Sequence, residues 1–155
     1  MLVDEELMIH YAYRLNWHLP KEQQEEAIEL LAAEVPREKL PLIFLKYAKE
    51  CWPNAIKVME KVGYPQNETA FPKLFQLFQD LNWPGAIEAV EYLKSVDKKV
   101  VANYLEKASV QAEQERDTEW LYFLNEVREQ LNIGPAYFRD KETYHYMLQP
   151  HRNEP

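Results

Sequence analysis

The apolar positions of the chain recur with the spacing of α-helices. Downstream of three tryptophans they lie at offsets of three or four and then seven residues, which places them on one helical face. The sets are Ala55, Ile56, Met59 and Val62 after Trp52, Ala86, Ile87, Val90 and Leu93 after Trp83, and Phe123, Leu124, Val127 and Leu131 after Trp120. The chain has 3 glycines, too few for a β-rich fold with many tight turns. We therefore predict an all-α protein.

The four tryptophans themselves recur along the sequence, at positions 17, 52, 83 and 120. Intervals of this length are typical of repeat proteins built from helix pairs. We predict four antiparallel pairs over 4–33, 38–62, 67–95 and 97–131, with helices at 4–14, 20–33, 38–50, 53–62, 67–80, 83–95, 97–115 and 118–131. Stacked side by side, these pairs would form a short right-handed α-solenoid, and we expect residues 1–155 to be a single domain.

Local signals agree with these boundaries. Pro53 and Pro84 fall where the first turn of a following helix tolerates a residue without an amide hydrogen. Gly63 marks a helix end, and Asn67 and Thr118 are candidate N-caps. Residues 132–155 depart from the pattern and are rich in aromatic side chains, so we predict an irregular tail that packs on the last helix pair and covers the open end of the stack.

The Trp-Pro junctions of the predicted pairs resemble those of HEAT-like α-solenoids. More narrowly, the segment Leu81-Asn82-Trp83-Pro84-Gly85-Ala86, together with the upstream Gly63-Tyr64-Pro65 and Phe71-Pro72-Lys73-Leu74, resembles a bacterial family of small helical-repeat proteins that is defined only as a domain of unknown function. The resemblance implies a helical-repeat fold and a cytoplasmic bacterial protein. It implies no catalytic residues.

Charge and chemistry narrow the function classes. With 26 acidic and 18 basic residues the chain carries a formal charge of −8, the opposite of what a nucleic-acid backbone binder needs. A lone Cys51 excludes an internal disulfide, and the sequence has no apolar run long enough to span a bilayer. No two of the four histidines are three or four residues apart, so we expect neither a metal nor an organic cofactor, and no catalytic residue. A cytoplasmic protein that does not bind membranes fits these features.

One charge pattern is a candidate binding surface. Glu22, Glu25, Glu26 and Glu29 follow helical spacing and would form an acidic stripe along the helix at 20–33. We expect them to face solvent without matching Lys or Arg across from them. The stripe is either an ordinary solvated face or a docking surface for a basic partner. In both cases the repulsion between neighbouring carboxylates lowers the stability of the helix slightly, and a docking role would explain why this cost is tolerated.

The tryptophans leave two interpretations open. They either seal the core at each helix junction or, in the case of Trp17, Trp52 and Trp83, line one rim of the stack and bind a partner. In the second case Asn16 and Asn82, each directly before a Trp, would add polar contacts; otherwise they cap helix ends.

Together these observations favour a non-enzymatic protein–protein interaction module, monomeric, with an acidic N-terminal face that docks or neutralises a basic partner such as a nuclease toxin. The alternative is a nucleic-acid-binding or DNA-base-repair enzyme of HEAT-like fold. A local basic cluster at Lys94, Lys98, Lys99 and Lys107 favours that alternative, and the overall acidic charge argues against it.

Overall fold

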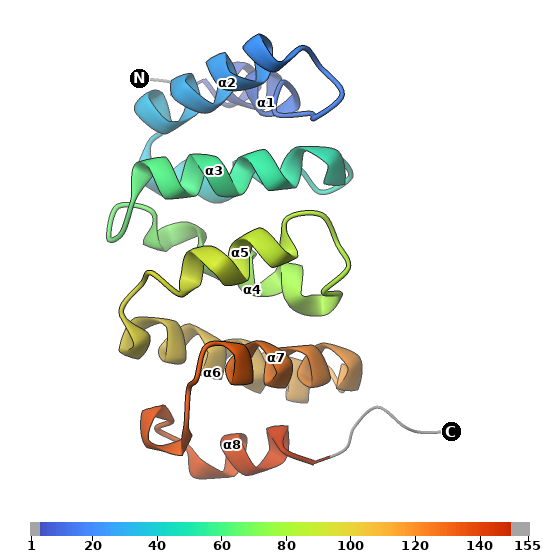
Figure 1. Ribbon diagram of the computed structural model, residues 1–155, viewed down its shortest axis with the longest axis vertical. Helices are drawn as coiled ribbons and strands as arrows, with labels where there is room; N and C mark the ends of the chain where they lie inside the picture. Colours follow the sequence, from blue (N-terminus) through green and yellow to red (C-terminus); the bar gives the residue numbers. More distant parts are fainter. Residues whose placement is uncertain (1–3, 150–155) are drawn as a thin grey trace. The chain divides into compact units, whose positions relative to one another are not determined.

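The computed structural model describes residues 4–149, and every regular element within that range is helical (Figure 1). The prediction of an all-α protein is therefore confirmed. Internal contacts divide the chain after Lys73 into two compact units, which we call the N-terminal unit and the C-terminal unit. No helix in the described range is both long enough and apolar enough to cross a membrane.

The N-terminal unit is built around three α-helices. They are α1 (Glu5–Tyr13), α2 (Lys21–Glu34) and α3 (Trp52–Val62), joined through the 3₁₀ segments η1 (Arg37–Ile43), η2 (Lys49–Cys51) and η3 (Glu68–Ala70). Helix α2 packs against both α1 and α3 (Figure 1). Its buried positions Ala27, Ile28 and Leu31 follow the predicted helical face, and the Asp4 carboxylate caps α1 by accepting the Glu6 amide hydrogen at 2.9 Å.

The predicted helix at 38–50 is wrong. This segment forms η1 and η2 instead, with non-helical backbone between them. Pro41 lies inside η1, where it donates no hydrogen bond and restricts the residue before it. Part of the apolar run is nevertheless buried, because Leu40, Ile43 and Phe44 enter the core, whereas Leu42 and Tyr47 are exposed. The apolar residues of this segment therefore indicated which side chains enter the core, but they did not indicate the conformation of the backbone.

Two boundaries of α3 follow the sequence signals. Pro53 lies in the first turn of the helix, where its missing amide hydrogen costs nothing. Gly63 ends the helix at a φ of 79°, a left-handed conformation that glycine adopts without strain, and its amide donates to the Met59 carbonyl at 3.0 Å. Asn67 stands at the predicted N-cap position, at the start of η3, but its side chain makes no capping hydrogen bond there, and its amide donates to the same Met59 carbonyl at 2.9 Å.

The C-terminal unit contains the longest helix, α6. Its elements are η4 (Leu77–Gln79), α5 (Ala86–Leu93), α6 (Lys98–Gln114), α7 (Thr118–Gln130), η5 (Pro135–Tyr137) and α8 (Lys141–Met147), while α4 (Phe71–Gln76) includes the division between the units. The predicted helix at 67–80 is divided into η3, α4 and η4. The helix predicted at 83–95 begins only at Ala86. Gly85, directly before it, has a φ of 92°, which a right-handed helix does not allow, so Pro84 lies outside the helix.

Helices α6 and α7 form the centre of this unit, as the predicted pairing of 97–115 with 118–131 requires. Trp120 of α7 is 1% exposed, and its indole N–H donates to the Phe75 carbonyl at 3.1 Å. The N-cap of α7 is Asp117 and not Thr118, because the Asp117 carboxylate accepts the Trp120 amide hydrogen at 3.0 Å.

The segment predicted as an irregular tail contains η5 and α8, and α8 contacts both α6 and α7. The Arg128 guanidinium lies 5.2 Å from the Tyr144 ring centre and also donates to the Ile133 carbonyl at 3.0 Å. Phe138 and Met147 are buried. The segment therefore contains a 3₁₀ turn and a short α-helix that ends at Met147, and its last residues, 150–155, lie outside the described range.

The burial of Trp120 yields a stability prediction. Changing Trp120→Phe should lower the free energy of unfolding by about 2–3 kcal/mol, because it leaves a small cavity and a buried Phe75 carbonyl without its donor. The matched change Trp17→Phe, at a side chain that is 44% exposed, should cost no more than about 0.5 kcal/mol. Urea unfolding of the two variants measures both values, and equal costs would contradict the assigned role of the Trp120 indole.

Candidate functional site

A buried amide network fixes the turn between α1 and α2. The Asn54 side chain of α3 is 6% exposed and donates to the Leu15 carbonyl at 2.7 Å and to the Gln24 Oε1 at 2.8 Å. Gln24 of α2 in turn donates to the carbonyls of Trp17 at 3.1 Å and Leu19 at 2.7 Å. These bonds give donors to carbonyls of the turn, which have no partner in a helical hydrogen-bond ladder. They also connect the turn to α2 and to α3.

Trp17 is held by its backbone but presents its side chain to solvent. Its amide donates to the Glu50 carbonyl at 3.3 Å, and its carbonyl belongs to the Gln24 network, yet 44% of the residue is exposed. Tyr13, at the end of α1, is 56% exposed. Asn16 serves the turn itself, since its side-chain oxygen accepts the His18 amide hydrogen at 2.8 Å. The structure therefore uses Asn16 for local structure and leaves Trp17 available for contact.

The other tryptophans do not share this environment. Trp52 is 7% exposed and its indole donates to the Leu45 carbonyl at 2.8 Å, so its assignment to a partner-binding rim is wrong. Trp83 is half-buried and Asn82 is exposed, but both belong to the C-terminal unit and form no part of this corner. The recurring tryptophans thus differ in burial: Trp52 and Trp120 are buried, Trp83 is half-buried and Trp17 is exposed.

The acidic stripe is present but partly neutralised. Glu22, Glu25, Glu26 and Glu29 are all exposed on α2. Glu29 pairs with Lys61 of α3 at 2.7 Å, and Lys57 and Lys61 line the same groove of about 480 Å³ as Glu25 and Glu29. The expectation that no cation lies across from the stripe is therefore wrong. Lys57 and Lys61 are four residues apart, the spacing that puts both on one face of α3, and this was the available sequence signal.

The one cysteine near this corner is buried. Cys51 is fully buried, with its sulfur 3.8 Å from the Tyr13 carbonyl oxygen. Burial, and secondarily the charge of Glu50, raise the pKa of the Cys51 thiol to about 11, which disfavours the nucleophilic thiolate. No group of three His, Cys, Asp or Glu side chains within residues 4–149 could hold a metal ion.

Comparison of the chain with protein families, with curated proteins and with solved structures found no match. No relative therefore supplies a site residue or an activity, and the HEAT-like resemblance remains an expectation from the sequence alone.

The amide network yields a prediction about the turn. Asn54→Ala should lower the free energy of unfolding by about 1–3 kcal/mol, because two acceptors lose their buried donor. It should also accelerate tryptic cleavage after Arg14, which lies at the start of the turn. Trp120→Phe is a control of similar stability in the other unit and should leave that cleavage rate much less changed. Identical acceleration in both variants would show global unfolding and contradict a local role for Asn54.

The environment of Cys51 predicts its reactivity. With a pKa of about 11, only about 0.1% of the thiol is ionised at pH 8. Modification of the native protein by a disulfide reagent should be at least about a hundredfold slower than in urea, and should accelerate as the pH rises toward 11. Absorbance of the released thiol measures both rates. Rapid native modification at pH 8 would place Cys51 in a reactive, accessible environment.

Proposed function

We propose that the chain is a non-enzymatic protein–protein interaction module and that the corner between α1 and α2 binds a basic partner protein. The observation that carries the proposal is Trp17, whose side chain is 44% exposed although its backbone is fixed by the Asn54 and Gln24 network. The exposed part of this large aromatic side chain is apolar surface that a partner would cover.

A fixed Trp is well suited to binding. Trp is enriched among the residues that dominate binding energy, since it buries a large area with few rotatable bonds. Because the turn is already ordered, a partner would not have to immobilise it, and less of the interaction energy would be lost as entropy. Tyr13, more than half exposed at the preceding helix end, extends the aromatic contact.

The charge of the corner favours a basic partner. Glu22, Glu25 and Glu26 are exposed on the same helix that holds the turn, and within the described residues none of the three has an ion-pair partner. Glu29 is excluded from the proposed surface because Lys61 occupies it. The three carboxylates would act on the association rate and on the choice of partner, while Trp17 would supply affinity.

The proposal is tested with charge-reversal baits. In affinity capture from a lysate of the native cells, we expect the wild-type bait to retain a partner protein. The double variant Glu22→Lys/Glu26→Lys should not retain it, and neither should Trp17→Ala. With that protein purified, affinity should fall about tenfold or more for each bait, and the salt sensitivity of binding should be smaller for the double reversal. Unfolding free energies should change by at most about 0.5 kcal/mol for the exposed Glu positions.

A matched control exists in the C-terminal unit. Glu113 and Glu129 are exposed, and Glu113→Lys/Glu129→Lys changes the net charge by the same amount. This control should retain the partner at wild-type affinity. If every protein bound by wild type were bound equally by Trp17→Ala and by the Glu22/Glu26 reversal, the corner would have no binding role and the proposed function would fail.

A further inference from the structure

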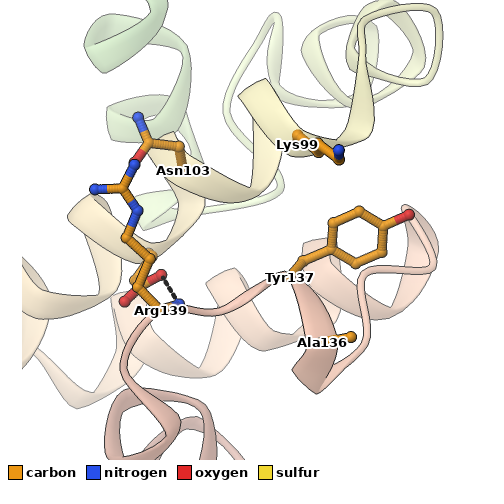
Figure 2. A pocket seen from close by; sticks show the side chains of 6 residues that line it. Lys99, Asn103, Ala136, Tyr137 and Arg139 are labelled. Atoms are coloured by element: carbon orange, nitrogen blue, oxygen red, sulfur yellow. Dashed lines mark hydrogen bonds between the residues drawn. The ribbon is translucent and has the colours of Figure 1, made fainter.

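A second polar cleft lies in the C-terminal unit, separate from the corner described above. It has a volume of about 520 Å³ and is lined by α6 and by the segment around η5, with Lys99, Asn103 and Glu106 on the first and Ala136, Tyr137 and Arg139 on the second (Figure 2). This volume is in the range of small-molecule sites. In Figure 2, Arg139 and Asn103 lie on one side of the cleft and Lys99 and Tyr137 on the other.

The wall that carries Arg139 is held in place by other side chains. The Glu106 carboxylate accepts the amide hydrogens of Arg139 and Asp140, each at 2.9 Å, and Figure 2 shows the first of these bonds. Lys141 donates to the carbonyls of Pro135 at 2.6 Å and Phe138 at 2.9 Å. The backbone of the wall is therefore fixed before any ligand arrives, and the negative charge of Glu106 is directed at backbone amides.

The side-chain charges of Lys99 and Arg139, unlike those of Glu106 and Lys141, do not hold the backbone of this wall. Among the described residues, neither Lys99 nor Arg139 has an ion-pair partner, and the Asn103 amide has no hydrogen-bond partner. By contrast, Lys94 is paired with Glu91 at 2.7 Å, and the Lys98 ammonium lies 3.4 Å from the Asn132 carbonyl oxygen. Of the basic cluster seen in the sequence, Lys94 and Lys98 thus have partners, and the Lys98 ammonium also lies 6.0 Å from the Tyr137 ring centre. Lys99 lines the cleft together with Arg139, which comes from outside that cluster.

We propose that this cleft binds a small organic molecule with two negative charges, carried either by one phosphate monoester or by two carboxylates. The Arg139 guanidinium offers the forked donors that match either anion, and Asn103 adds a neutral donor beside it. Lys99 provides a second positive charge on the opposite side of the same cleft, and both cations would attract a dianion bound between them. Tyr137 and Ala136 offer an apolar wall for the carbon body of the ligand.

The test uses three probes on the full chain at low ionic strength: phenyl phosphate, glutarate and the monoanion acetate. Two-dimensional ¹H–¹⁵N NMR titrations follow the side-chain resonances of Asn103 and Arg139. We expect one or both dianions to shift these resonances with saturation, and acetate to bind at least about tenfold more weakly, since it can satisfy only one cation. A preference for phenyl phosphate identifies a phosphate monoester, and a preference for glutarate identifies a dicarboxylate.

Variants locate the binding. Arg139→Gln and Lys99→Gln should each weaken the preferred dianion by about tenfold or more, the effect of losing one charge-assisted hydrogen bond. Arg116→Gln and Lys94→Gln, exposed positions of the same unit outside the cleft, are the matched controls and should bind as wild type does. The proposal is overturned if no dianion saturates these resonances, if acetate binds equally well, or if the cleft variants bind like the controls. Binding of a single-stranded oligonucleotide, but of neither dianion, would also overturn it.

Discussion

Backbone carbonyls that lie outside the helices, or in the last turn of one, must find donors, and this requirement shapes both units. Pro41 and Pro84 interrupt two of the predicted helices and leave segments whose carbonyls are not all satisfied by helical hydrogen bonds. Side chains on the regular helices supply the missing donors. Asn54 bonds the Leu15 carbonyl, and the indoles of Trp52 and Trp120 bond those of Leu45 and Phe75. Removing one such donor would leave a buried acceptor unpaired, which costs more than the bond itself contributes.

The same requirement produces the two candidate surfaces. At the N-terminal corner the donors that satisfy the turn also make it rigid, and rigidity is what allows Trp17 to stay exposed in a defined position. At the C-terminal cleft, Glu106 and Lys141 satisfy the groups around η5 and leave Arg139 free to face the cleft. In each unit, some charged or amide side chains hold the backbone through hydrogen bonds, and others make no such bond. Only the side chains without such a bond are available to a partner or ligand.

The sequence predicted regular helices well and irregular ones poorly, for physical reasons. Periodic apolar faces placed α2, α3, α6 and α7 within a few residues, because burial on one side repeats with the helical turn. The segments at 38–50 and 67–80 are apolar but proline-containing, and burial alone does not fix backbone conformation. The intervals between the tryptophans also could not show which of them is buried, because burial depends on which other elements of the fold pack against each side chain. The ion pair of Glu29 with Lys61 likewise required the packing of α2 on α3, which no single-helix pattern contains.

Charge explains why the two surfaces would select such different targets. The chain as a whole carries −8, so an extended polyanion such as nucleic acid would be repelled over most of its length even if one segment reached the cleft. A small dianion avoids most of this repulsion, because at physiological salt a charge is screened beyond about 8 Å and the ligand experiences mainly the charges that line the cleft, which are Lys99, Arg139 and Glu106. A basic protein, by contrast, gains from the same net charge as it approaches the carboxylates of α2. The net charge that argues against a nucleic-acid enzyme is therefore compatible with both proposed ligands.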